Sequence, residues 1–383
     1  MISCKPQGDE FKYIDIDSID NKNHRIISPK ILKVKNAPSR ASRYTQPGDV
    51  LFSMVRPYLK NIALVEEGSC IASTGFFVCS PMQLLTSEYC YYMMLSDYVV
   101  YGLNQYMKGD NSPSINNGHI TSWLYPIPPI NEQLRITTEI KKWFVFIDDL
   151  ESGKIELESL IKQVKSKILD LAISGKLIPQ DPNDEPAIEL LKRIIPAFKP
   201  CDNSHYENLP ENWCLAKVKD VFVINPRNKA EDNTIAGFIP MTLIDDGYSN
   251  MFSYEKRKWG SIKTGFTHFA DGDVAVAKIS PCLENRKSIV LRDLPNAIGA
   301  GTTELHVFRS SVVVPEYALY FFKSEYFISK CVGTFNGVVG QQRVGKNIIE
   351  EIQIPIPPIN EQTKIVSTIE TIFTQLNTIT AEL

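Results

Sequence analysis

The octamer Pro126–Gln133, PIPPINEQ, occurs again at Pro355–Gln362, a step of 229 positions along the chain. Its prolines are expected to exclude both helix continuation and sheet pairing until Asn131 or Asn360 caps a new helix, with a glutamate in the first turn. The octamer therefore predicts a rigid exit from a globular domain into a helix. Two copies predict two such domains, each followed by a helix.

The sequence preceding each octamer also matches between the two halves. Gly48-Asp49-Val50 corresponds to Gly272-Asp273-Val274, and SEYCYYMMLSDY (Ser87–Tyr98) corresponds to PEYALYFFKSEY (Pro315–Tyr326). Such extended matching indicates an internal duplication. The halves share framework residues and differ in polar and charged loop residues, as expected of a scaffold that presents two different recognition surfaces.

Each half is predicted to be a compact α+β domain. Segments such as DVLFSMV, NIALVEE and DVAVAKI favour strands, because they are rich in β-branched and aromatic residues. Ser87 is suited to the N-cap of the helix that follows in the first half, and Pro315 to the first turn of its counterpart. A proline-rich linker after the first octamer's helix is expected to contain a short helix near residues 186–195.

Both helices that follow the octamers carry apolar residues at steps of three and four, which is typical of a coiled-coil seam. The first helix is predicted from Asn131 to about Gly175, roughly 65 Å at 1.5 Å per residue. We expect the seams to pair antiparallel about a pseudo-two-fold axis, which would leave residues 131–151 for a partner; the alternative is that each helix packs only on its own domain. The predicted pairing residues are Leu157, Ile161, Val164, Ile168, Leu171, Ile365, Ile369, Ile372, Leu376 and Ile379.

Length and composition limit the class of protein. A chain of 383 residues predicts two or more domains. No apolar run reaches about 18 residues and no signal core is present, so we expect a cytoplasmic protein with no membrane partner. The eight cysteines include no CxxC pair and no histidine cluster lies beside them, so we expect reduced thiols and no metal site.

The net charge is only −3, but three stretches of the chain contain basic residues and no acidic residue. They lie at residues 21–48, 256–270 and 326–349. Such runs are either solvated loops or nucleic-acid contacts. Guanidinium and amide groups can read base edges and lysines can hold phosphates, whereas the alternative for each residue is a solvated charge or a polar turn. The candidate contacts are Arg40, Arg43, Arg56, Lys60, Asn111, Ser114, Arg257, Lys258, Lys278, Arg286, Thr302, Thr303, Gln341, Gln342, Arg343 and Lys346.

Two glycine-containing motifs raise the question of an enzyme. GQQRVGKN (340–347) approaches a phosphate-binding loop, but Asn347 stands where a magnesium-binding hydroxyl is needed and prolines interrupt the expected helix. IGAGTTEL (298–305) holds only GxG, so we interpret it as a glycine turn that places two threonines near a ligand. No catalytic triad or adenine-methylation motif is present, and a P-loop NTPase stays as an alternative that ATP binding to the isolated chain would reveal.

The two octamers, together with ILDLAISGKLIPQDPNDEPAIELLKRI (168–194), resemble the specificity subunit of type I restriction-modification systems. The resemblance covers nearly the whole chain. It implies two target recognition domains separated by conserved coiled-coil-like helices in a pseudo-two-fold, circular arrangement. The implied organisation is a first target recognition domain at 1–125, a helical spacer at 126–175, a linker at 176–212, a second target recognition domain at 213–354 and a short second spacer at 355–383.

The same resemblance implies a non-catalytic protein. Each domain would read one part of a bipartite site in double-stranded DNA, and the helices would set the spacing and dock two methyltransferase subunits. Restriction or translocase subunits would be further partners. No cofactor is expected on this chain, and S-adenosylmethionine is expected in the methyltransferase subunits.

The halves also differ in extent. Residues from Trp213 to Phe238 include about 25 with no counterpart before Tyr13, and the second seam is shorter than the first. The unmatched helix end, linker and domain start would be contiguous if the chain were closed into a circle. We therefore expect a circular architecture without one of its two junctions, or an end-truncated chain; a scaffold or decoy that has lost DNA reading is the alternative function.

Overall fold

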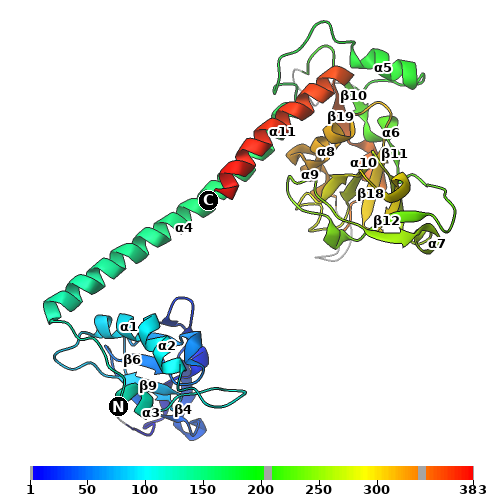
Figure 1. Ribbon diagram of the computed structural model, residues 1–383. Coiled ribbons are helices and arrows are strands. Elements are labelled where there is room, and N and C mark those ends of the chain that lie inside the picture. Colours follow the sequence, from blue (N-terminus) through cyan, green and yellow to red (C-terminus); the bar gives the residue numbers. More distant parts are fainter. Residues whose placement is uncertain (1–2, 202–208, 335–341, 383) are drawn as a thin grey trace. The chain divides into compact units, whose positions relative to one another are not determined.

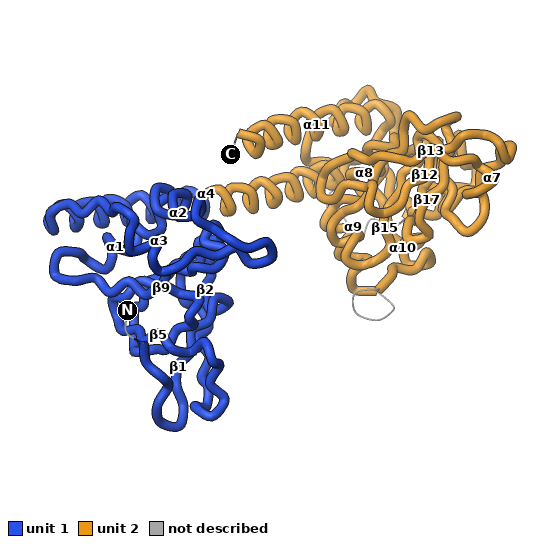
Figure 2. Tube along the Cα trace, turned by 60° about the horizontal axis from the view of Figure 1, so that its bottom comes forward, with its two compact units in different colours: residues 1–152 blue, residues 153–383 orange. Residues whose placement is uncertain are grey.

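The computed structural model describes residues 3–201, 209–334 and 342–382 (Figure 1). The chain forms two compact units, unit 1 (Met1–Ser152) and unit 2 (Gly153–Leu383) (Figure 2). The longest helix, α4 (Ile130–Ile173), runs from unit 1 into unit 2. Unit 2 therefore includes the second half of α4 and the linker, in addition to the globular half predicted to begin at residue 213. Among the described residues, no helix is long and apolar enough to cross a membrane.

Unit 1 consists of small sheets and short helices that precede α4. Its elements are β1 (Glu10–Ile14), η1 (Ile16–Ser18), β2 (Ile19–Asp20), β3 (Arg25–Ile26), β4 (Lys30–Lys33), η2 (Val34–Asn36), β5 (Ala41–Thr45), β6 (Val50–Ser53), η3 (Pro57–Leu59), β7 (Ile62–Leu64), β8 (Cys70–Ser73), β9 (Phe76–Cys79), α1 (Ser87–Leu95), α2 (Asp97–Asn104) and α3 (Asn117–Thr121). The main sheets have the strand orders β4-β1-β8-β5 and β7-β6-β9, and β2 pairs with β3.

Unit 2 repeats this plan and adds strands to it. Its elements are α5 (Ala187–Ile194), β10 (Cys214–Lys217), α6 (Val218–Val221), β11 (Val223–Ile224), β12 (Ile235–Ile239), η4 (Met241–Leu243), β13 (Glu255–Lys258), α7 (Trp259–Ile262), β14 (Thr267–Ala270), β15 (Val274–Ala277), β16 (Ser288–Val290), η5 (Pro295–Ala297), β17 (Ile298–Gly301), β18 (Leu305–Arg309), α8 (Pro315–Lys323), α9 (Glu325–Val332), α10 (Lys346–Glu351), β19 (Gln353–Ile356) and α11 (Ile359–Ala381). Its sheets have the orders β13-β12-β17-β14, β11-β18-β15-β16 and β10-β19.

The duplication extends to the strand register. β1 pairs antiparallel with β4 and parallel with β8, as β12 pairs antiparallel with β13 and parallel with β17. The buried carboxylates of the two Gly-Asp-Val segments also make equivalent hydrogen bonds, each to the backbone amide three residues earlier. Asp49 Oδ2 accepts a bond from the Gln46 amide at 2.9 Å, and Asp273 Oδ2 accepts one from the Ala270 amide at 2.7 Å. Both units are therefore built on one α+β framework.

The repeated octamer is fixed to each framework by its final glutamine, which is fully buried in both units. Gln133 Oε1 accepts from the Thr86 amide at 2.9 Å, and its Nε2 donates to the carbonyls of Leu84 and Pro128 at 2.9 and 2.8 Å. One side-chain amide thus satisfies three backbone groups from two segments. It ties the start of α4 to the segment that leads into α1.

Gln362 makes the matching set of bonds in unit 2. Its Oε1 accepts from the Val314 amide at 2.7 Å, and its Nε2 donates to Pro357 O at 3.0 Å and to Val312 O at 3.5 Å. A tyrosine from the first helix of each globular half, α1 or α8, supports each octamer as well. Tyr89 donates to Pro126 O at 3.0 Å, and Tyr317 donates to Pro355 O at 2.8 Å.

Two details of the octamer differ from the sequence-based prediction. Pro355 lies within β19, which pairs antiparallel with β10, because a strand can place a proline where no ladder donor is needed. The helices α4 and α11 begin at Ile130 and Ile359, one residue before the asparagines predicted as caps. The buried glutamine, rather than an asparagine cap, fixes these helix starts. In the first helix of unit 1 the cap is Thr86, whose hydroxyl accepts from the Tyr89 amide, rather than Ser87.

Within unit 2 the second half of α4 packs against α11. Lys165 Nζ donates to Asn377 Oδ1 at 2.6 Å and lies 5.7 Å from the centre of the Phe373 ring. Toward the other end, Lys364 Nζ lies 3.4 Å from carboxylate oxygens of Asp181 and Asp184, which follow α4 in the chain. The two helices therefore run antiparallel.

The buried seam deviates from the predicted pairing residues at two positions. Ile168 shares one core cluster with Ile365 and Ile369, and Ile372 and Leu376 pack at its margin. Ile161 is also buried, and Leu157 and Leu171 are partly buried. Val164 and Ile379, however, are 38% and 44% exposed. A straight helix drifts from a 3.5-residue repeat, and Leu169 and Phe373, which were not predicted, occupy the core instead.

The first half of α4 carries exposed apolar residues. Between positions 143 and 150 six large apolar side chains are 44–60% exposed: Trp143, Phe144, Val145, Phe146, Ile147 and Leu150. Phe144 stacks on Tyr92 of α1 at a centroid distance of 6.1 Å, which covers only part of its ring. A cluster of this kind on one helix is typical of an interaction surface.

We expect the substitution Gln133→Leu to lower the free energy of unfolding of unit 1 by about 2–4 kcal/mol, because the buried Thr86 amide and Leu84 carbonyl would lose their partner. Amide hydrogen exchange of unit 1 in the intact chain, followed in increasing urea, measures this change. Gln7→Leu, at an exposed position of the same unit, is the matched control and should shift stability by less than about 0.5 kcal/mol. Equal stability of the two variants would contradict the role given to Gln133.

His306 on β18 is a buried histidine held in its neutral form. Its Nε2 lies 3.2 Å from Val344 O and its Nδ1 lies 3.3 Å from the side-chain nitrogen Nδ2 of Asn225. This network fits a tautomer with the proton on Nε2, donating to the carbonyl. Burial lowers the pKa of His306 from 6.5 to about 4.

Because the unfolded chain binds a proton on His306 more readily than the folded one, stability should be complete above pH 6.5 and fall as the pH drops toward 4. We expect this histidine to remove about 2–3 kcal/mol from the free energy of unfolding of unit 2 by pH 4.5. Comparing chemical unfolding of the wild type and His306→Gln at pH 7 and pH 4.5 isolates its contribution. If both proteins lose the same free energy, the imidazole is not responsible.

Candidate nucleic-acid interface

Three separate segments of unit 1 meet beside the end of β6. They are the stretch after β6, the turn between β8 and β9, and the loop before α3. The Met54 amide donates to Gly75 O at 2.8 Å, and the Ile115 amide donates to Met54 O at 2.9 Å. These backbone bonds bring loops that are far apart in sequence to one place.

The predicted polar residues of unit 1 gather at this junction. The Arg56 amide donates to Pro113 O at 2.8 Å, and its guanidinium Nη2 donates to Asn111 O at 2.7 Å, which fixes an exposed arginine against the loop. The carbonyl of Arg40 accepts from the Thr74 amide at 2.8 Å. Arg56 itself has a left-handed backbone, with φ of 48°. A strained non-glycine residue beside exposed polar groups is typical of a functional loop.

Unit 2 has the corresponding junction beside the end of β15. The Lys278 amide donates to Glu304 O at 2.9 Å, and Lys278 O accepts from the Val344 amide at 2.9 Å. The Ser280 amide donates to Gln342 O at 2.8 Å. The turn between β17 and β18 and the segment before α10 are thereby joined to the loop after β15.

Isolated β-bridges show that the two junctions are equivalent. Val55 bridges Ser114 in unit 1, and Ile279 bridges Arg343 in unit 2. We call each junction a loop edge: residues 54–59, 73–75 and 108–115 in unit 1, and residues 278–285, 302–304 and 342–346 in unit 2. Equivalent backbone positions on the two loop edges carry different side chains, so each edge presents its own pattern of donors and acceptors.

The strongest electrostatic feature of the second loop edge is a two-pronged ion pair. Arg343 Nε lies 2.7 Å from Glu304 Oε2, and its Nη2 lies 3.0 Å from Oε1. The guanidinium lowers the pKa of Glu304, which therefore keeps its charge and orients the arginine. Lys346 is the first residue of α10, and its Nζ lies 3.2 Å from Glu350 Oε1 in the same helix. Both cations are about half exposed and remain accessible to a ligand.

The structure thus gathers many of the predicted contacts on the loop edges. Those on or beside an edge are Arg40, Arg56, Asn111, Ser114, Lys278, Thr302, Thr303, Gln342, Arg343 and Lys346. Gln341 lies outside the described residues. Whether any of these side chains touches DNA stays a prediction.

Two further predicted contacts form ion pairs within the framework, next to the loop edges. Lys60 and Arg286 occupy equivalent positions with left-handed backbones, at φ of 52° and 58°. Lys60 pairs with Asp97 at 2.7 Å, and Arg286 pairs with Glu325 at 2.6 Å, each acid being the first residue of a helix. The side chain of Arg286 is only 19% exposed. These cations stabilise the loop against the helix, and whether either of them also touches DNA stays a prediction.

Three other predicted contacts lie on strands away from the loop edges. Arg257 stacks 3.8 Å from the centre of the Phe238 ring and pairs with Glu255 at 2.6 Å, which engages its planar group within the protein. Lys258 Nζ donates weakly to Asn233 at 3.3 Å. Arg43 on β5 has a buried Nε for which the described residues offer no hydrogen-bond partner. The sequence could not show that these three residues lie away from the loop edges, because it does not reveal which loops meet.

The glycine-rich segment 298–301 is a strand rather than the predicted turn. A Cβ on Gly299 would lie 2.5 Å from Gly237 O, and one on Gly301 would lie 2.4 Å from Ile239 O. The glycines therefore permit the close approach of β12 and β17 and do not form a cofactor loop. Of the motif at 340–347, residues 340 and 341 lie outside the described part; Gln342–Asn347 form a bridge and the start of α10.

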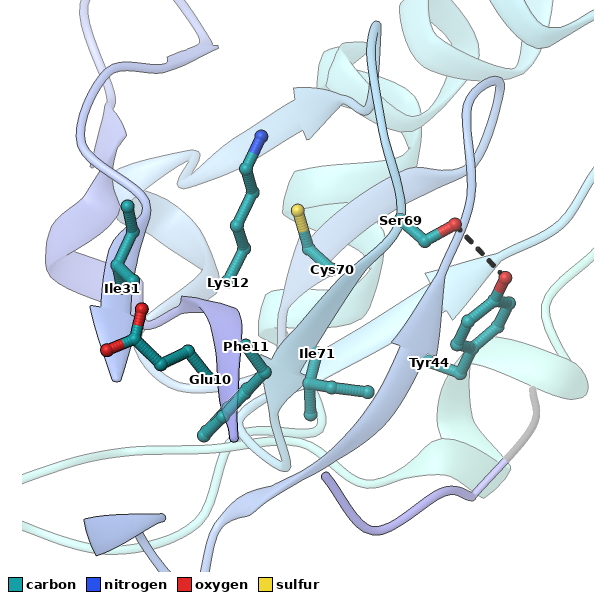
Figure 3. Close-up of a pocket in the computed structure, with 8 residues that line it drawn as sticks. All are labelled: Glu10, Phe11, Lys12, Ile31, Tyr44, Ser69, Cys70 and Ile71. Carbon is teal, nitrogen blue, oxygen red and sulfur yellow. Dashed lines mark hydrogen bonds between the residues drawn. The ribbon is translucent and has the colours of Figure 1, made fainter. Parts of the chain in front are cut away.

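A separate hollow of about 430 Å³ is lined by residues on and beside the strands of the β4-β1-β8-β5 sheet (Figure 3). Lys12 and Glu10 are its charged lining residues, and the Tyr44 and Ser69 hydroxyls lie 3.1 Å apart at one side. Burial raises the pKa of the Cys70 thiol in its wall, which disfavours the reactive thiolate. Residues 3–201, 209–334 and 342–382 contain no group of three His, Cys, Asp or Glu side chains able to hold a metal ion.

A tryptophan–glutamate contact in unit 2 was not predicted from the sequence. Trp213 Nε1 donates to Glu361 Oε2 at 3.0 Å and lies 3.1 Å from Gln180 Oε1. Burial raises the pKa of Glu361. The repeated Glu-Gln at the end of each octamer was visible in the sequence. Two of its partners, however, lie far away in the chain: Thr86 is 47 positions from Gln133, and Trp213 is 148 positions from Glu361.

Comparison with known proteins agrees with this architecture. Residues 210–383 match the family model of the type I restriction modification DNA specificity domain. The chain is 40% identical over 236 residues to the Escherichia coli type I restriction enzyme EcoEI specificity subunit, and 42% identical over 234 residues to the EcoAI specificity subunit of the same species. These matches cover 57% and 56% of this chain and 40% of each relative, so the match spans well under half the length of those relatives.

The fold is that of a solved specificity subunit. The crystal structure of the HsdS subunit from Thermoanaerobacter tengcongensis superposes with a TM-score of 0.62 at 21% identity, covering the whole of this chain and 88% of the other. Thus the sequence matches identify the domain at residues 210–383, and the superposition extends the fold to the whole chain. Residues 210–383 therefore match the family of type I restriction modification DNA specificity domains, and the whole chain has the fold of a solved HsdS subunit.

Proposed function

We propose that this chain is the DNA-reading subunit of a type I restriction-modification complex and performs no chemistry itself. The observation that carries the proposal is the pair of equivalent loop edges, one in each unit, which differ in their polar side chains. Loops on a rigid framework are the usual place for recognition residues. The family match of residues 210–383 and the specificity subunits among the relatives support the same function.

Each loop edge would read one part of a bipartite site in double-stranded DNA. An arginine held by a carboxylate, such as Arg343 beside Glu304, is oriented to donate two bonds to a guanine edge. Backbone-positioned residues such as Arg56 would hold phosphates. Because two weak readers joined in one chain act at high effective concentration, the combined site would bind far more tightly than either part.

The helices would set the gap between the two parts of the site. α4 has 44 residues, about 66 Å at 1.5 Å per residue. Its exposed apolar residues at 143–150 support a further proposal, that this helix docks partner subunits. Two methyltransferase subunits carrying S-adenosylmethionine are the proposed partners, with restriction or translocase subunits beyond them, all acting in the cytoplasm.

The experiment that tests this function combines genetics and chemistry in the native host. Deleting the gene for this chain should abolish adenine methylation at one split sequence motif, and restoring the gene should restore it. Co-purification with a methyltransferase encoded beside it tests the complex directly. If methylation is unchanged and no complex forms, a scaffold or decoy without DNA reading becomes the better account.

Within the assembled complex, we expect Arg343→Ala to weaken binding of the target DNA by about 1–3 kcal/mol and to relax the choice of base at one position. Binding should be measured at fixed salt on target and single-base variants. Arg193→Ala is the matched control, because Arg193 also makes a two-pronged ion pair, with Glu185 at 2.6 and 3.1 Å, but lies on the linker helix α5. Equal effects of the two changes would exclude Arg343 as a base reader.

A further inference from the structure

The first segment of each loop edge is followed by a left-handed residue whose carbonyl is held by a side chain from elsewhere in the unit. In unit 2, Lys323 Nζ donates to Arg286 O at 2.9 Å. In unit 1, His24 Nδ1 lies 3.1 Å from Lys60 O. Arg286 and Lys60 occupy equivalent positions, but the side chains that reach them come from a helix in one unit and a turn in the other. Two different side chains thus serve one carbonyl position.

Lys323 is the last residue of α8 and is fully buried. Besides Arg286 O, its Nζ donates to Gly247 O at 2.6 Å and to Ser249 O at 2.8 Å. These three carbonyls match the three N–H donors of a lysine ammonium. Because a buried charge is costly without such partners, the lysine ties the turn 245–251 to the end of the loop.

The turn 245–251 supports the loop edge directly as well. The Gly247 amide donates at 2.7 Å to the carbonyl of Asn285, the last residue of the first loop-edge segment. The Tyr248 ring packs edge-on against Phe373 of α11, at a centroid distance of 5.6 Å. The turn therefore lies between the helix pair and the loop edge, and Lys323 holds it there.

Unit 1 makes the same junction with other side chains. Its turn 20–25 follows η1 as the turn of unit 2 follows η4, and the ends of both turns are joined by β-bridges. Tyr91 of α1 donates to His24 O at 3.2 Å, so a helix again holds the turn. Leu95 stands at the position equivalent to Lys323 and has no ammonium to offer. The imidazole of His24 holds the carbonyl instead.

We propose that Lys323 and His24 are positioning residues for DNA reading, each holding one loop edge in the conformation that contacts its half of the DNA site. This inference rests on the function proposed above. Both residues act through the carbonyl of a neighbouring residue, so they are distinct from the side chains proposed to contact bases or phosphates. Each half of the site then has its own anchor.

The anchor of unit 2 should respond to pH. Burial lowers the pKa of Lys323 to about 7, and the Arg286 guanidinium acts in the same direction. Asp245 and Asp246 of the turn oppose this shift, and Glu325 pairs with Arg286. The neutral amine has only two N–H groups, so one of the three carbonyls loses its donor as the pH rises through about 7. Unit 2 should therefore hold its loop edge best below that pH.

The anchor of unit 1 should not respond over the same range. Burial lowers the pKa of His24, while its bond to Lys60 O and the charge of Asp20 oppose the shift and the Lys60 ammonium reinforces it. A neutral imidazole with its proton on Nδ1 donates to the carbonyl as the imidazolium does. The bond is thus kept on both sides of the pKa, and unit 1 supplies an internal reference.

The test uses the assembled complex and compares affinities for the split target and for single-base variants in each half. Lys323→Met should lower the preference for the target about tenfold in one half and leave the other half unchanged. Tyr317→Phe is the matched control, because it removes a buried hydrogen bond of the same helix α8, to Pro355 O of the octamer, and should leave both preferences unchanged.

A pair of variants tests His24. Asparagine and aspartate have the same shape and both tolerate the left-handed backbone of this position, but only asparagine can donate to Lys60 O. His24→Asp should lower the preference about tenfold in the half that Lys323→Met leaves unchanged, and His24→Asn should restore it. A purely structural loss at this position would not separate the two variants.

The pH profile of the wild type needs no variant. As the pH rises from about 6 to about 8.5, the preference should fall in one half of the site and stay constant in the other, whereas Lys323→Met should be low and constant in that first half. This arm tests the inference even if Lys323→Met does not fold.

Hydrogen exchange of the free protein separates the inference from the proposed function, because it requires no DNA. In Lys323→Met the amides of Gly247 and Arg286, which donate to Asn285 O and Leu283 O, should exchange faster than in the wild type. In Tyr317→Phe they should exchange at the wild-type rate.

Two results would overturn the inference. A complex that binds its split target with the same preferences in Lys323→Met, His24→Asp and the wild type would show that the loop edges need no such anchors, and the proposed function would stand. A wild-type complex that prefers no split sequence would reject the proposed function, and this inference with it.

Discussion

A buried side-chain amide at the end of each octamer determines how the rest of the molecule is assembled. Gln133 and Gln362 each join the start of a long helix to the backbone that leads into the first helix of the globular half. A buried amide can satisfy its hydrogen bonds only in one arrangement of those segments, and leaving the partners unpaired costs free energy. The angle at which each helix leaves its domain is therefore fixed by side-chain chemistry at a single residue. The prolines before it limit the backbone, and the glutamine selects one conformation among those that remain.

On this fixed frame the residues that stabilise the loops are distinct from the residues proposed to read DNA. Lys60 and Arg286 show the separation, because equivalent cations pair with equivalent acids and hold the loops in the same place in both units. The residues at the tips of those loops differ. A scaffold of this kind can change what it reads without changing how it folds.

The sequence predicted the duplication, the α+β class and the helix exits correctly, because each depends on residues that are close together in the chain. It predicted helix α4 within two residues at each end. It could not show that Lys60 has a partner, since Asp97 lies 37 positions away. The same distance problem concealed the pairing of Trp213 with Glu361 and the close approach of β12 and β17 that requires Gly299 and Gly301. Ten of the predicted polar contacts were nevertheless brought onto or beside the loop edges, because loop residues of this composition share one end of the framework.

The exposed aromatic and aliphatic residues of α4 at positions 143–150 have a consequence for the life of the protein in the cell. If this helix docks partner subunits as proposed, a copy made in excess of them would display the kind of apolar cluster that chaperones and proteases recognise in incompletely folded chains. Assembly would hide that cluster and so extend the lifetime of the chain. The amount of this subunit would then follow the supply of its partners, and quality control, rather than transcription alone, would keep the components in proportion.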